Sequence, residues 1–178
     1  MTAHHTMLQL IASGDHKLMR KVNKWPAPKW VRLGAIAATR AGDGWLWYLV
    51  GLSILLFGGD TRLPAIAAAG SAAAIGVGLF ISLKRVSGRK RPCEIEPHCW
   101  ATILPPDQFS FPSGHTITAF AVAVTLGMFY PFVLAIMLFC AVCIATSRVL
   151  LGMHFLSDVV VGAVLGTGLA LISHAIFV

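Results

Sequence analysis

The sequence is poor in charged side chains, and in acidic ones above all. Only 12% of its 178 residues are charged, with seven Asp and Glu against 14 Lys and Arg, while 57% are hydrophobic. Soluble domains carry about twice that share of charge, and the mean hydropathy here is +0.77. The shortage of charge excludes an ordinary soluble domain and indicates an integral membrane protein, of a length that suits one domain.

Three further signals are missing. Residues 1–28 contain no continuous apolar stretch of the kind found in a secretory signal peptide. The basic residues lack interleaved aromatic side chains, so we expect no nucleic-acid partner. The four cysteines indicate no metal site, since Cys140 and Cys143 lie in an apolar run, where we expect buried thiols. Two of them, Cys93 and Cys99, flank a polar loop and would pair if that loop faced an oxidising compartment.

Five apolar segments dominate what is present. A transmembrane helix needs about 20 apolar residues. In the last segment, Gly162 and Gly166 would allow close packing against another helix of the chain or against a second copy. We therefore predict an all-α fold, a polytopic transmembrane helix bundle with five spans and six as the alternative. The expected spans are 45–57, 63–83, 116–130, 132–146 and 159–178.

The first 44 residues have a different character. Residues 6–24 place apolar and basic side chains on opposite faces of a helix, which is typical of a helix lying on lipid headgroups. Residues 31–41 are apolar but too short and too charged to span, so we expect a second surface helix there. The chain thus divides into an interfacial N-terminal segment, 1–44, and a transmembrane core, 45–178.

Ionisable residues interrupt the apolar core at three places. Such residues are costly inside a membrane and usually functional. They close the second predicted span, open the third, and join the fourth to the fifth. If successive helices alternate in direction, all three places meet at one face of the membrane. The ionisable residues concerned are Lys84, Arg91, His115, Arg148, His154 and Asp158, and Ser113 and Gly114 directly precede His115.

Five of these residues are suited to binding a phosphate group. Lys84, Arg91 and Arg148 would bring three cations together. Ser113 and Gly114 stand where the first turn of a helix exposes backbone N–H groups, which bind anions well. The sequence therefore predicts a pocket for a tetrahedral phosphoryl group. We expect this group to belong to the substrate, and we expect no cofactor.

The other three residues carry the chemistry. His154 and Asp158 are four apart, so on a helix they would share one face, with the carboxylate fixing the imidazole tautomer. We expect His154 to attack phosphorus, Asp158 to orient it, and His115 to protonate the leaving oxygen and then activate water. A metal site is the rival hypothesis, with His98 as a further ligand, but three nearby cations would repel a divalent ion.

The connection between the second and third spans is the only long one. It runs from about residue 84 to residue 111 and is rich in proline and aromatic residues, which favours an ordered cap over the site. We expect Glu94, Glu96 and Asp107 to be solvated loop residues rather than catalytic ones.

The three motifs resemble those of the type-2 phosphatidic acid phosphatase superfamily. That pattern is Lys-x6-Arg-Pro, then Pro-Ser-Gly-His, then Ser-Arg-x5-His-x3-Asp, and this sequence matches it throughout, with the likeness covering about residues 45–175. The resemblance implies a helical membrane phosphatase without metal or cofactor. It assigns phosphate binding to Lys84, Arg91, Ser113, Gly114 and Arg148, and catalysis to His115, His154 and Asp158.

The leading hypothesis is a lipid phosphate phosphatase that works through a phosphohistidine. Its substrate would be phosphatidylglycerol phosphate, phosphatidic acid, or an isoprenyl phosphate or diphosphate. One alternative is a phosphotransferase that passes the phosphoryl group to another lipid or sugar. A second is a non-enzymatic anion carrier, which gives no reason for a His154–Asp158 pair that faces His115.

We expect a multi-pass protein of the bacterial inner membrane. The basic N-terminal segment and the site lie on one side of a five-span protein, and the positive-inside rule would make that side cytoplasmic. The resemblance to bacterial relatives and a Cys93–Cys99 pair favour the periplasmic side, which we adopt as the expectation. Membrane lipids are the expected surroundings, and no oligomeric state follows from the sequence.

Overall fold

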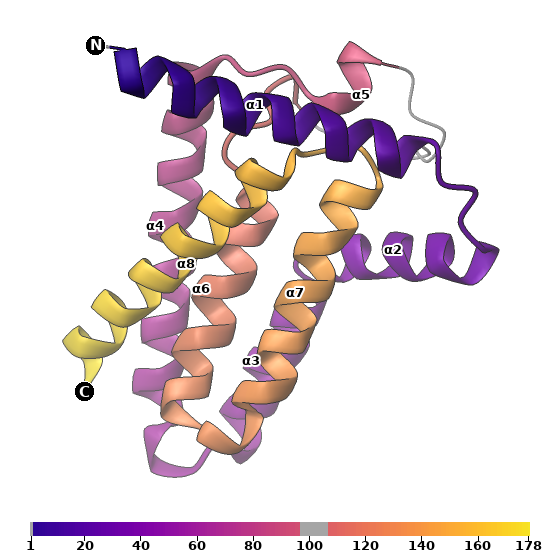
Figure 1. Ribbon diagram of the computed structural model, residues 1–178. Coiled ribbons are helices and arrows are strands. Elements are labelled where there is room, and N and C mark those ends of the chain that lie inside the picture. Colours follow the sequence, from indigo (N-terminus) through magenta and orange to yellow (C-terminus); the bar gives the residue numbers. More distant parts are fainter. Residues whose placement is uncertain (1, 97–106) are drawn as a thin grey trace.

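A bundle of helices forms the body of the molecule (Figure 1). The computed structural model describes residues 2–96 and 107–178, and side chains from residue 9 onwards. The bundle consists of α3 (Trp45–Phe57), α4 (Arg62–Ser87), α6 (Gly114–Phe129), α7 (Leu134–Leu150) and α8 (Leu156–Phe177). Short pieces join them: the 3-10 turns Gly59–Thr61 and Pro131–Val133 and the single-turn helix α5 (Pro92–Ile95). The predicted helical membrane bundle is confirmed.

The spans differ in length. Within the described ranges three segments are long and apolar enough to cross a membrane, namely Gly59–Ser87, Pro131–Leu150 and Leu156–Phe177. The apolar helices α3 and α6 have 13 and 16 residues, so at 1.5 Å per residue they reach about 20 and 24 Å, short of the ~30 Å hydrocarbon core. The protein is a multi-pass membrane protein in which two helices are short for a full crossing.

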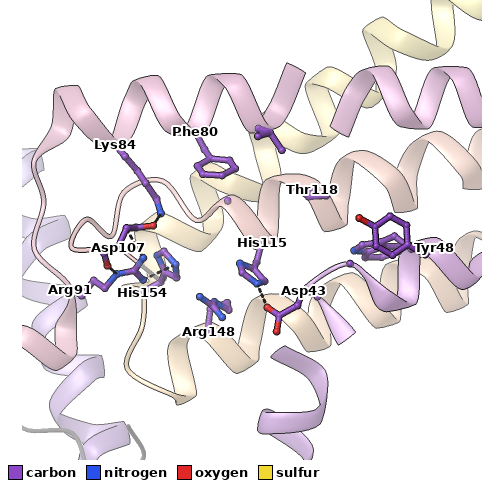
Figure 2. A pocket seen from close by; sticks show the side chains of 15 residues that line it. Asp43, Tyr48, Phe80, Lys84, Arg91, Asp107, His115, Thr118, Arg148 and His154 are labelled. Carbon is purple, nitrogen blue, oxygen red and sulfur yellow. Dashed lines mark hydrogen bonds and ion pairs between the residues drawn. The ribbon is translucent and has the colours of Figure 1, made fainter. Parts of the chain in front are cut away.

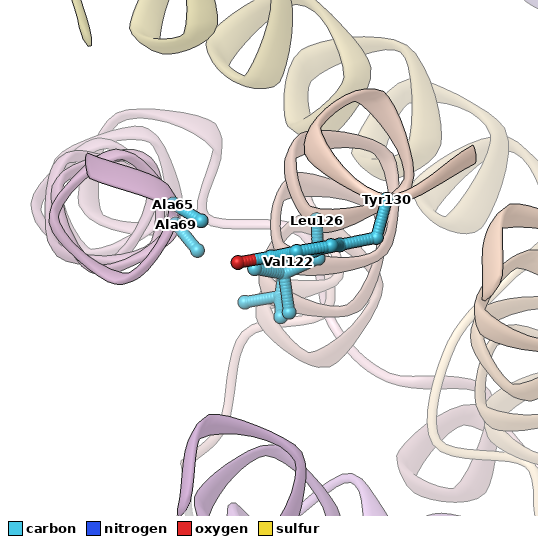
Figure 3. Packing of buried hydrophobic residues seen from close by; sticks show 5 residues of the cluster. All are labelled: Ala65, Ala69, Val122, Leu126 and Tyr130. Carbon is cyan, nitrogen blue, oxygen red and sulfur yellow. The ribbon is translucent and has the colours of Figure 1, made fainter. Parts of the chain in front are cut away.

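Helix α6 stands at the centre and packs against α4, α7 and α8. Small residues permit this. On α8, an added Cβ at Gly166 would lie 2.4 Å from the Ile117 carbonyl oxygen of α6, and one at Gly162 would lie 3.0 Å from that of Ser113. Of the two uses predicted for this glycine pair, packing within the chain is the one observed. Figure 3 shows a second contact, where two alanines of α4 face α6; the cluster is Ala65, Ala69, Val122, Leu126 and Tyr130.

The turns at the far end of the bundle are tied together. The Tyr130 hydroxyl donates to the Gly58 carbonyl oxygen at 3.0 Å, and it accepts from the Thr61 hydroxyl at 3.2 Å. Residues 58–61 join α3 to α4, and Tyr130 follows α6. The helices therefore alternate in direction, and the other ends of α4, α6, α7 and α8 come together as the hydropathy predicted.

Two N-terminal helices pack on the bundle. The helix α1 (Thr2–Asn23) crosses the end at which α8 begins, and α2 (Lys29–Ala41) lies against α7 (Figure 1). Both predicted surface helices are present as helices. Their inner faces are buried against protein, however: Asp15 and Met19 of α1 and Thr39 of α2 are at most 6% exposed.

Residues 97–106 of the long connection lie outside the described residues. Cys99 and His98 are among them, so the predicted Cys93–Cys99 pair and the candidate metal ligand His98 also lie outside the described residues. Among the described residues of this connection, Glu96 forms an ion pair of 2.7 Å with Arg20 of α1.

Candidate active site

A cavity of about 360 Å³ opens at the end where the three motifs meet (Figure 2). Its walls come from α3, α4, α6 and α7 and from the connections next to these helices. Two of the predicted residues, Ser113 and Asp158, lie behind the wall rather than in it. Six line the cavity: Lys84, Arg91, Gly114, His115, Arg148 and His154.

Two cations share a carboxylate at one side of the cavity. Lys84 Nζ lies 2.6 Å from Asp107 Oδ2, and Arg91 Nη2 lies 2.8 Å from Asp107 Oδ1. Arg91 is 1% exposed and also donates from Nε to the Asp107 carbonyl oxygen at 2.7 Å. Burial acts to raise the pKa of Asp107, but hydrogen bonds and charge from Lys84 and Arg91 outweigh it and lower that pKa. Asp107 was expected to be a solvated loop residue; it is a charged part of the site.

Arg148 is held from the N-terminal segment. Its Nη1 donates to the Thr39 hydroxyl of α2 at 2.5 Å, and the side chain is nearly fully buried. Among the described residues, Arg148 Nε has no hydrogen-bond partner. Because buried donors are normally satisfied, this N–H is suited to an anion in the cavity.

The hydrogen bonds of His154 define its tautomer. Nδ1 lies 2.6 Å from the Ser110 carbonyl oxygen, and Nε2 lies 3.3 Å from Arg91 Nη1. A carbonyl oxygen only accepts and a guanidinium only donates, so this network assigns the hydrogen to Nδ1 and the lone pair to Nε2. Burial first, and then the charges of Arg148, Arg91 and Lys84, hold the pKa of His154 well below its ordinary value. The imidazole is therefore neutral, with the Nε2 lone pair on the side of Arg91.

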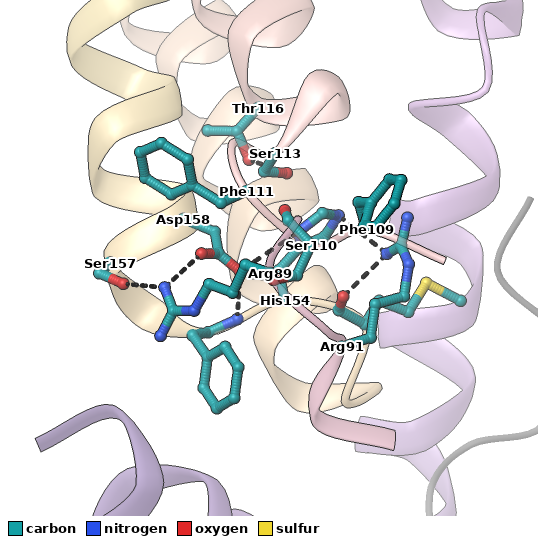
Figure 4. A network of polar contacts seen from close by, with 12 residues as sticks. Arg89, Arg91, Phe109, Ser110, Phe111, Ser113, Thr116, His154, Ser157 and Asp158 are labelled. Atoms are coloured by element: carbon teal, nitrogen blue, oxygen red, sulfur yellow. Dashed lines mark hydrogen bonds and ion pairs between the residues drawn. The ribbon is translucent and has the colours of Figure 1, made fainter. Parts of the chain in front are cut away.

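Asp158 supports His154 less directly than predicted (Figure 4). His154 lies before α8, which begins at Leu156, so the two residues do not share a helical face. The distance from His154 Nδ1 to Asp158 Oδ2 is 3.6 Å, an ion-pair distance too long for a hydrogen bond. The carboxylate instead accepts from the Phe155 N–H at 2.8 Å and from Arg89 Nη1 at 2.6 Å.

His115 is paired with an acid that the motifs do not contain. Its Nε2 lies 2.8 Å from Oδ1 of Asp43, in the turn between α2 and α3. The other carboxylate oxygen of Asp43, Oδ2, lies 3.4 Å from Arg40 Nη1. The sequence held one usable signal for this residue: Asp43 is one of seven acids and stands directly before an apolar span.

The start of α6 has a divided role. Ser113 is fully buried, with its N–H donating to the Asp158 carbonyl oxygen at 3.2 Å and its hydroxyl accepting from Thr116 at 2.9 Å. Gly114 lines the cavity, and an added Cβ there would lie 2.9 Å from the Phe80 ring. Gly114 thus lets the helix start approach the cavity, while the Ser113 side chain faces the protein interior.

The acidic side chains of the cavity wall are paired with other side chains of the protein. Among residues 2–96 and 107–178, no group of three or more His, Cys, Asp or Glu is placed to hold a metal ion. The two acids of the cavity wall, Asp43 and Asp107, are engaged by His115 and by Lys84 with Arg91.

Comparison with known sequences gives consistent matches. The sequence model of the PAP2 superfamily matches residues 64–178. Decaprenylphosphoryl-5-phosphoribose phosphatase of Mycobacterium tuberculosis is 32% identical over 139 residues, which cover 76% of each chain. Lipid A 1-phosphatase of Rhizobium johnstonii is 30% identical over 176 residues, covering 87% of this chain and 70% of the relative.

Solved structures share the fold. The crystal structure of Aquifex aeolicus LpxE superposes with a TM-score of 0.75 at 28% identity, covering 88% of this chain and 92% of that one. A transmembrane PAP2-type phosphatidylglycerolphosphate phosphatase from Bacillus subtilis gives a TM-score of 0.71 at 23% identity, covering 94% and 86%. The second likeness is evidence for the arrangement of helices alone.

Proposed function

Because the chain belongs to the PAP2 superfamily, we propose that it is a phosphatase that hydrolyses a membrane lipid phosphate through a phosphohistidine intermediate. One observation carries the proposal: the Nε2 lone pair of His154 lies in a cavity lined by Lys84, Arg91 and Arg148 and by a second imidazole. A nucleophile and an acid that flank a cluster of cations suit phosphoryl transfer through a covalent intermediate.

The first step forms the covalent intermediate. His154 Nε2 attacks phosphorus, and the bond from phosphorus to the lipid oxygen breaks. His115 gives its proton to that oxygen, so the product leaves as an alcohol, or as a monophosphate where the substrate is a diphosphate. Donors of Lys84, Arg91 and Arg148 stabilise the charge on the transferring oxygens. The ring of His154 becomes positive, and Asp158 at 3.6 Å stabilises it.

The second step releases phosphate. His115, now neutral, takes a proton from water as the water attacks phosphorus, and the bond from phosphorus to His154 Nε2 breaks. Asp43, 2.8 Å from His115, stabilises the imidazolium at the start and the end of the cycle. No metal is required at either step, because the protein's own cations supply the charge that a divalent ion would provide.

The lining of the cavity supports a proposal for how the lipid lies. Its polar end carries the cations, and its other wall is formed by Trp47 and Tyr48 of α3 with Val77 and Phe80 of α4. We place the phosphate at the polar end and the start of the tail between α3 and α4. Two relatives that are at least 30% identical are named as phosphatases of a decaprenylphosphoryl phosphoribose and of lipid A. These names support a lipid phosphomonoester or diphosphate as the substrate class.

The decisive experiment is to trap the intermediate. The purified protein is mixed in EDTA with phosphatidic acid, phosphatidylglycerol phosphate and farnesyl diphosphate, each labelled with ³²P, and quenched in alkali, which preserves phosphohistidine. We expect label on His154 and free phosphate as the product. The His154→Ala variant should lose both and still be stabilised against heat by inorganic phosphate.

His174→Ala is the matched control, since His174 lies on α8 near its C-terminal end, beside Phe129 of α6. It should retain label and turnover. Absence of turnover for every lipid phosphate, or phosphate release that survives in His154→Ala, would contradict the proposal. Label that moves to an added lipid or sugar acceptor instead of water would identify a phosphotransferase.

We also propose that the site faces the periplasm from the inner membrane. The site lies at the end of the bundle where α8 begins, and Phe177 lies at the opposite end. A green fluorescent protein fused after Val178 should therefore fold and fluoresce in the cytoplasm. A fused alkaline phosphatase that is active at this position, with no fluorescence, would place the site on the cytoplasmic face.

A further inference from the structure

Helix α1 is joined to the start of α8 by a buried carboxylate. Asp15 is 6% exposed, and it accepts from the N–H of Ser157 at 3.1 Å and from the Ser157 hydroxyl. The first N–H groups of a helix have no partner within that helix. Asp15 thus caps α8 from a different helix, at the turn that carries Asp158.

An arginine links this carboxylate to Asp158. Arg89 donates from Nη2 to Asp15 Oδ2 at 2.7 Å and from Nη1 to Asp158 Oδ1 at 2.6 Å. Its guanidinium carbon lies 4.2 Å from the centre of the Phe155 ring. Figure 4 shows Arg89 reaching Ser157 and Asp158 on the start of α8. The planar guanidinium suits a bridge between two carboxylates, which a lysine cannot reproduce.

We propose that Asp15 and Arg89 are positioning residues for the nucleophile: Asp15 holds Arg89, and Arg89 holds Asp158 beside His154. The inference rests on the proposed function. Neither residue belongs to the predicted site, and Asp15 lies outside residues 64–178, which the family comparison matches. The helix α1 would then be a working part of the active site and not only a surface helix.

The charges give the reason. Asp15, Arg89 and Asp158 together carry one net negative charge, close to a ring that becomes positive when it is phosphorylated. Without the charge of Asp15, Arg89 fully neutralises Asp158, and the positive ring of His154 loses its stabilisation. Because that positive charge develops in the transition state, the loss should appear in kcat rather than in KM.

The same helix closes the space behind the nucleophile. A small pocket there is lined by Leu18 and Met19 of α1, by Val149 of α7 and by His154. Met19 is 5% exposed and His154 is 2% exposed. Exclusion of water strengthens the interactions among the charges inside. The packing of α1 and its carboxylate therefore act on the same imidazole.

The test uses the full-length protein with phosphatidic acid in mixed detergent micelles. Asp15→Asn keeps the shape and an accepting oxygen but removes the charge. We expect kcat to fall by about tenfold, the effect of one hydrogen bond to a charged group, with KM within about twofold. Asp15→Glu, which keeps the charge, should recover part of kcat. Arg89→Lys should lower kcat similarly, because a single ammonium nitrogen does not reproduce the two separate nitrogens with which Arg89 contacts Asp15 and Asp158.

The two changes combined show whether the residues act through each other. The double variant with Asp15→Asn and Arg89→Lys should have a kcat only slightly below that of Arg89→Lys alone. Arg20→Gln is the matched control: it removes an exposed ion pair of the same helix and should leave kcat unchanged. Each kcat is referred to folded protein, and inorganic phosphate should inhibit the folded variants as it inhibits the wild type.

The outcomes separate this inference from the proposed function. A wild-type protein that releases no phosphate would end the proposed function. An active wild type with Asp15→Asn and Arg89→Lys at full kcat would overturn only the positioning role, as would losses that add fully in the double variant. If Asp15→Asn lowers the unfolding temperature and leaves kcat unchanged, Asp15 contributes to stability alone.

Discussion

His115 Nε2 and Asp43 Oδ1 lie 2.8 Å apart, although 72 residues separate them in the sequence. A carboxylate only accepts, so Nε2 carries the hydrogen, and the negative charge stabilises the imidazolium form of the ring. In the proposed mechanism this is the form that protonates the leaving lipid oxygen. In that mechanism Asp43 would act on catalysis through His115.

Substitution of Asp43 should affect substrates according to their leaving groups. With Asp43→Asn we expect kcat for phosphatidic acid to fall by about tenfold, within the range of a general acid–base contribution. The loss should be smaller for p-nitrophenyl phosphate, whose phenolate leaves without a proton. Steady-state kinetics with both substrates measure the difference.

Asp60→Asn serves as the control, because Asp60 is an exposed acid in the turn at the other end of the bundle. It should leave both rates unchanged. Equal losses on the two substrates in Asp43→Asn would contradict a role through the acid His115.

The pH dependence should follow from the neutral state of His154. Burial and the nearby cations lower its pKa well below the usual value, which is about 6.5 in model peptides. The neutral ring is the nucleophile, so activity should persist as pH falls through 6.5 and be lost only below the lowered pKa of His154. NMR titration of ¹⁵N-labelled histidine in the free enzyme, assigned with His154→Gln, measures that pKa directly.

Arg148 contributes the largest charge effect on this pKa. In Arg148→Gln the pKa of His154 should therefore rise, and the acidic limb of kcat/KM should move to higher pH even as the rate itself falls. Titration of His154 at or above 6.5 in the wild type would rule out this account.

The sequence predicted the convergence of the three motifs for a simple physical reason. Hydropathy shows where the chain crosses the membrane, and successive crossings must alternate in direction. The ends of α4 and α7 and the starts of α6 and α8 then have to share one face. Lys84, Arg91, His115, Arg148 and His154 line one cavity as a result.

The contacts around the motifs were beyond that reasoning. Asp43 and Asp107 come from turns, where no periodic pattern shows the direction of a side chain. The spacing of His154 and Asp158 suggested a shared helical face, but α8 begins two residues after His154. The Ser110 carbonyl oxygen, a backbone group that no motif can encode, accepts the hydrogen of Nδ1 instead.

Asp107 should compete with phosphate for the cations of the site. Its carboxylate lies 2.6 Å from Lys84 and 2.8 Å from Arg91, and its pKa is lowered, so it stays charged. In Asp107→Asn the inhibition constant of inorganic phosphate should fall about fivefold, since a unit charge ~4 Å away is worth about 1 kcal/mol in water. Inhibition of phosphatidic acid hydrolysis measures the constant.

Glu94→Gln is the control for this change, because Glu94 is an exposed acid of α5 in the same connection. Its phosphate inhibition should match the wild type. Weaker inhibition in Asp107→Asn would mean that the carboxylate holds Lys84 and Arg91 in place and does not compete for them.

The packing of α8 on α6 can be tested with two glycines of one helix. An added Cβ at Gly166 would lie 2.4 Å from the Ile117 carbonyl oxygen and 3.0 Å from the Ala121 nitrogen, whereas one at Gly168 meets nothing within 4 Å. Gly166→Ala should therefore force the helices apart and cost about 1–3 kcal/mol, as overpacking does, while Gly168→Ala should be neutral or slightly stabilising.

Thermal unfolding in detergent, followed by circular dichroism, compares the two variants. The start of α8 carries Asp158, and α6 carries His115, so a shift between these helices would displace the two sides of the site from each other. We therefore expect Gly166→Ala to lower both the unfolding midpoint and kcat. Equal midpoints for the two variants would contradict this expectation. They would mean that the α6–α8 contact accommodates the added methyl group without rearrangement, although a close-packed backbone oxygen lies 2.4 Å from its position.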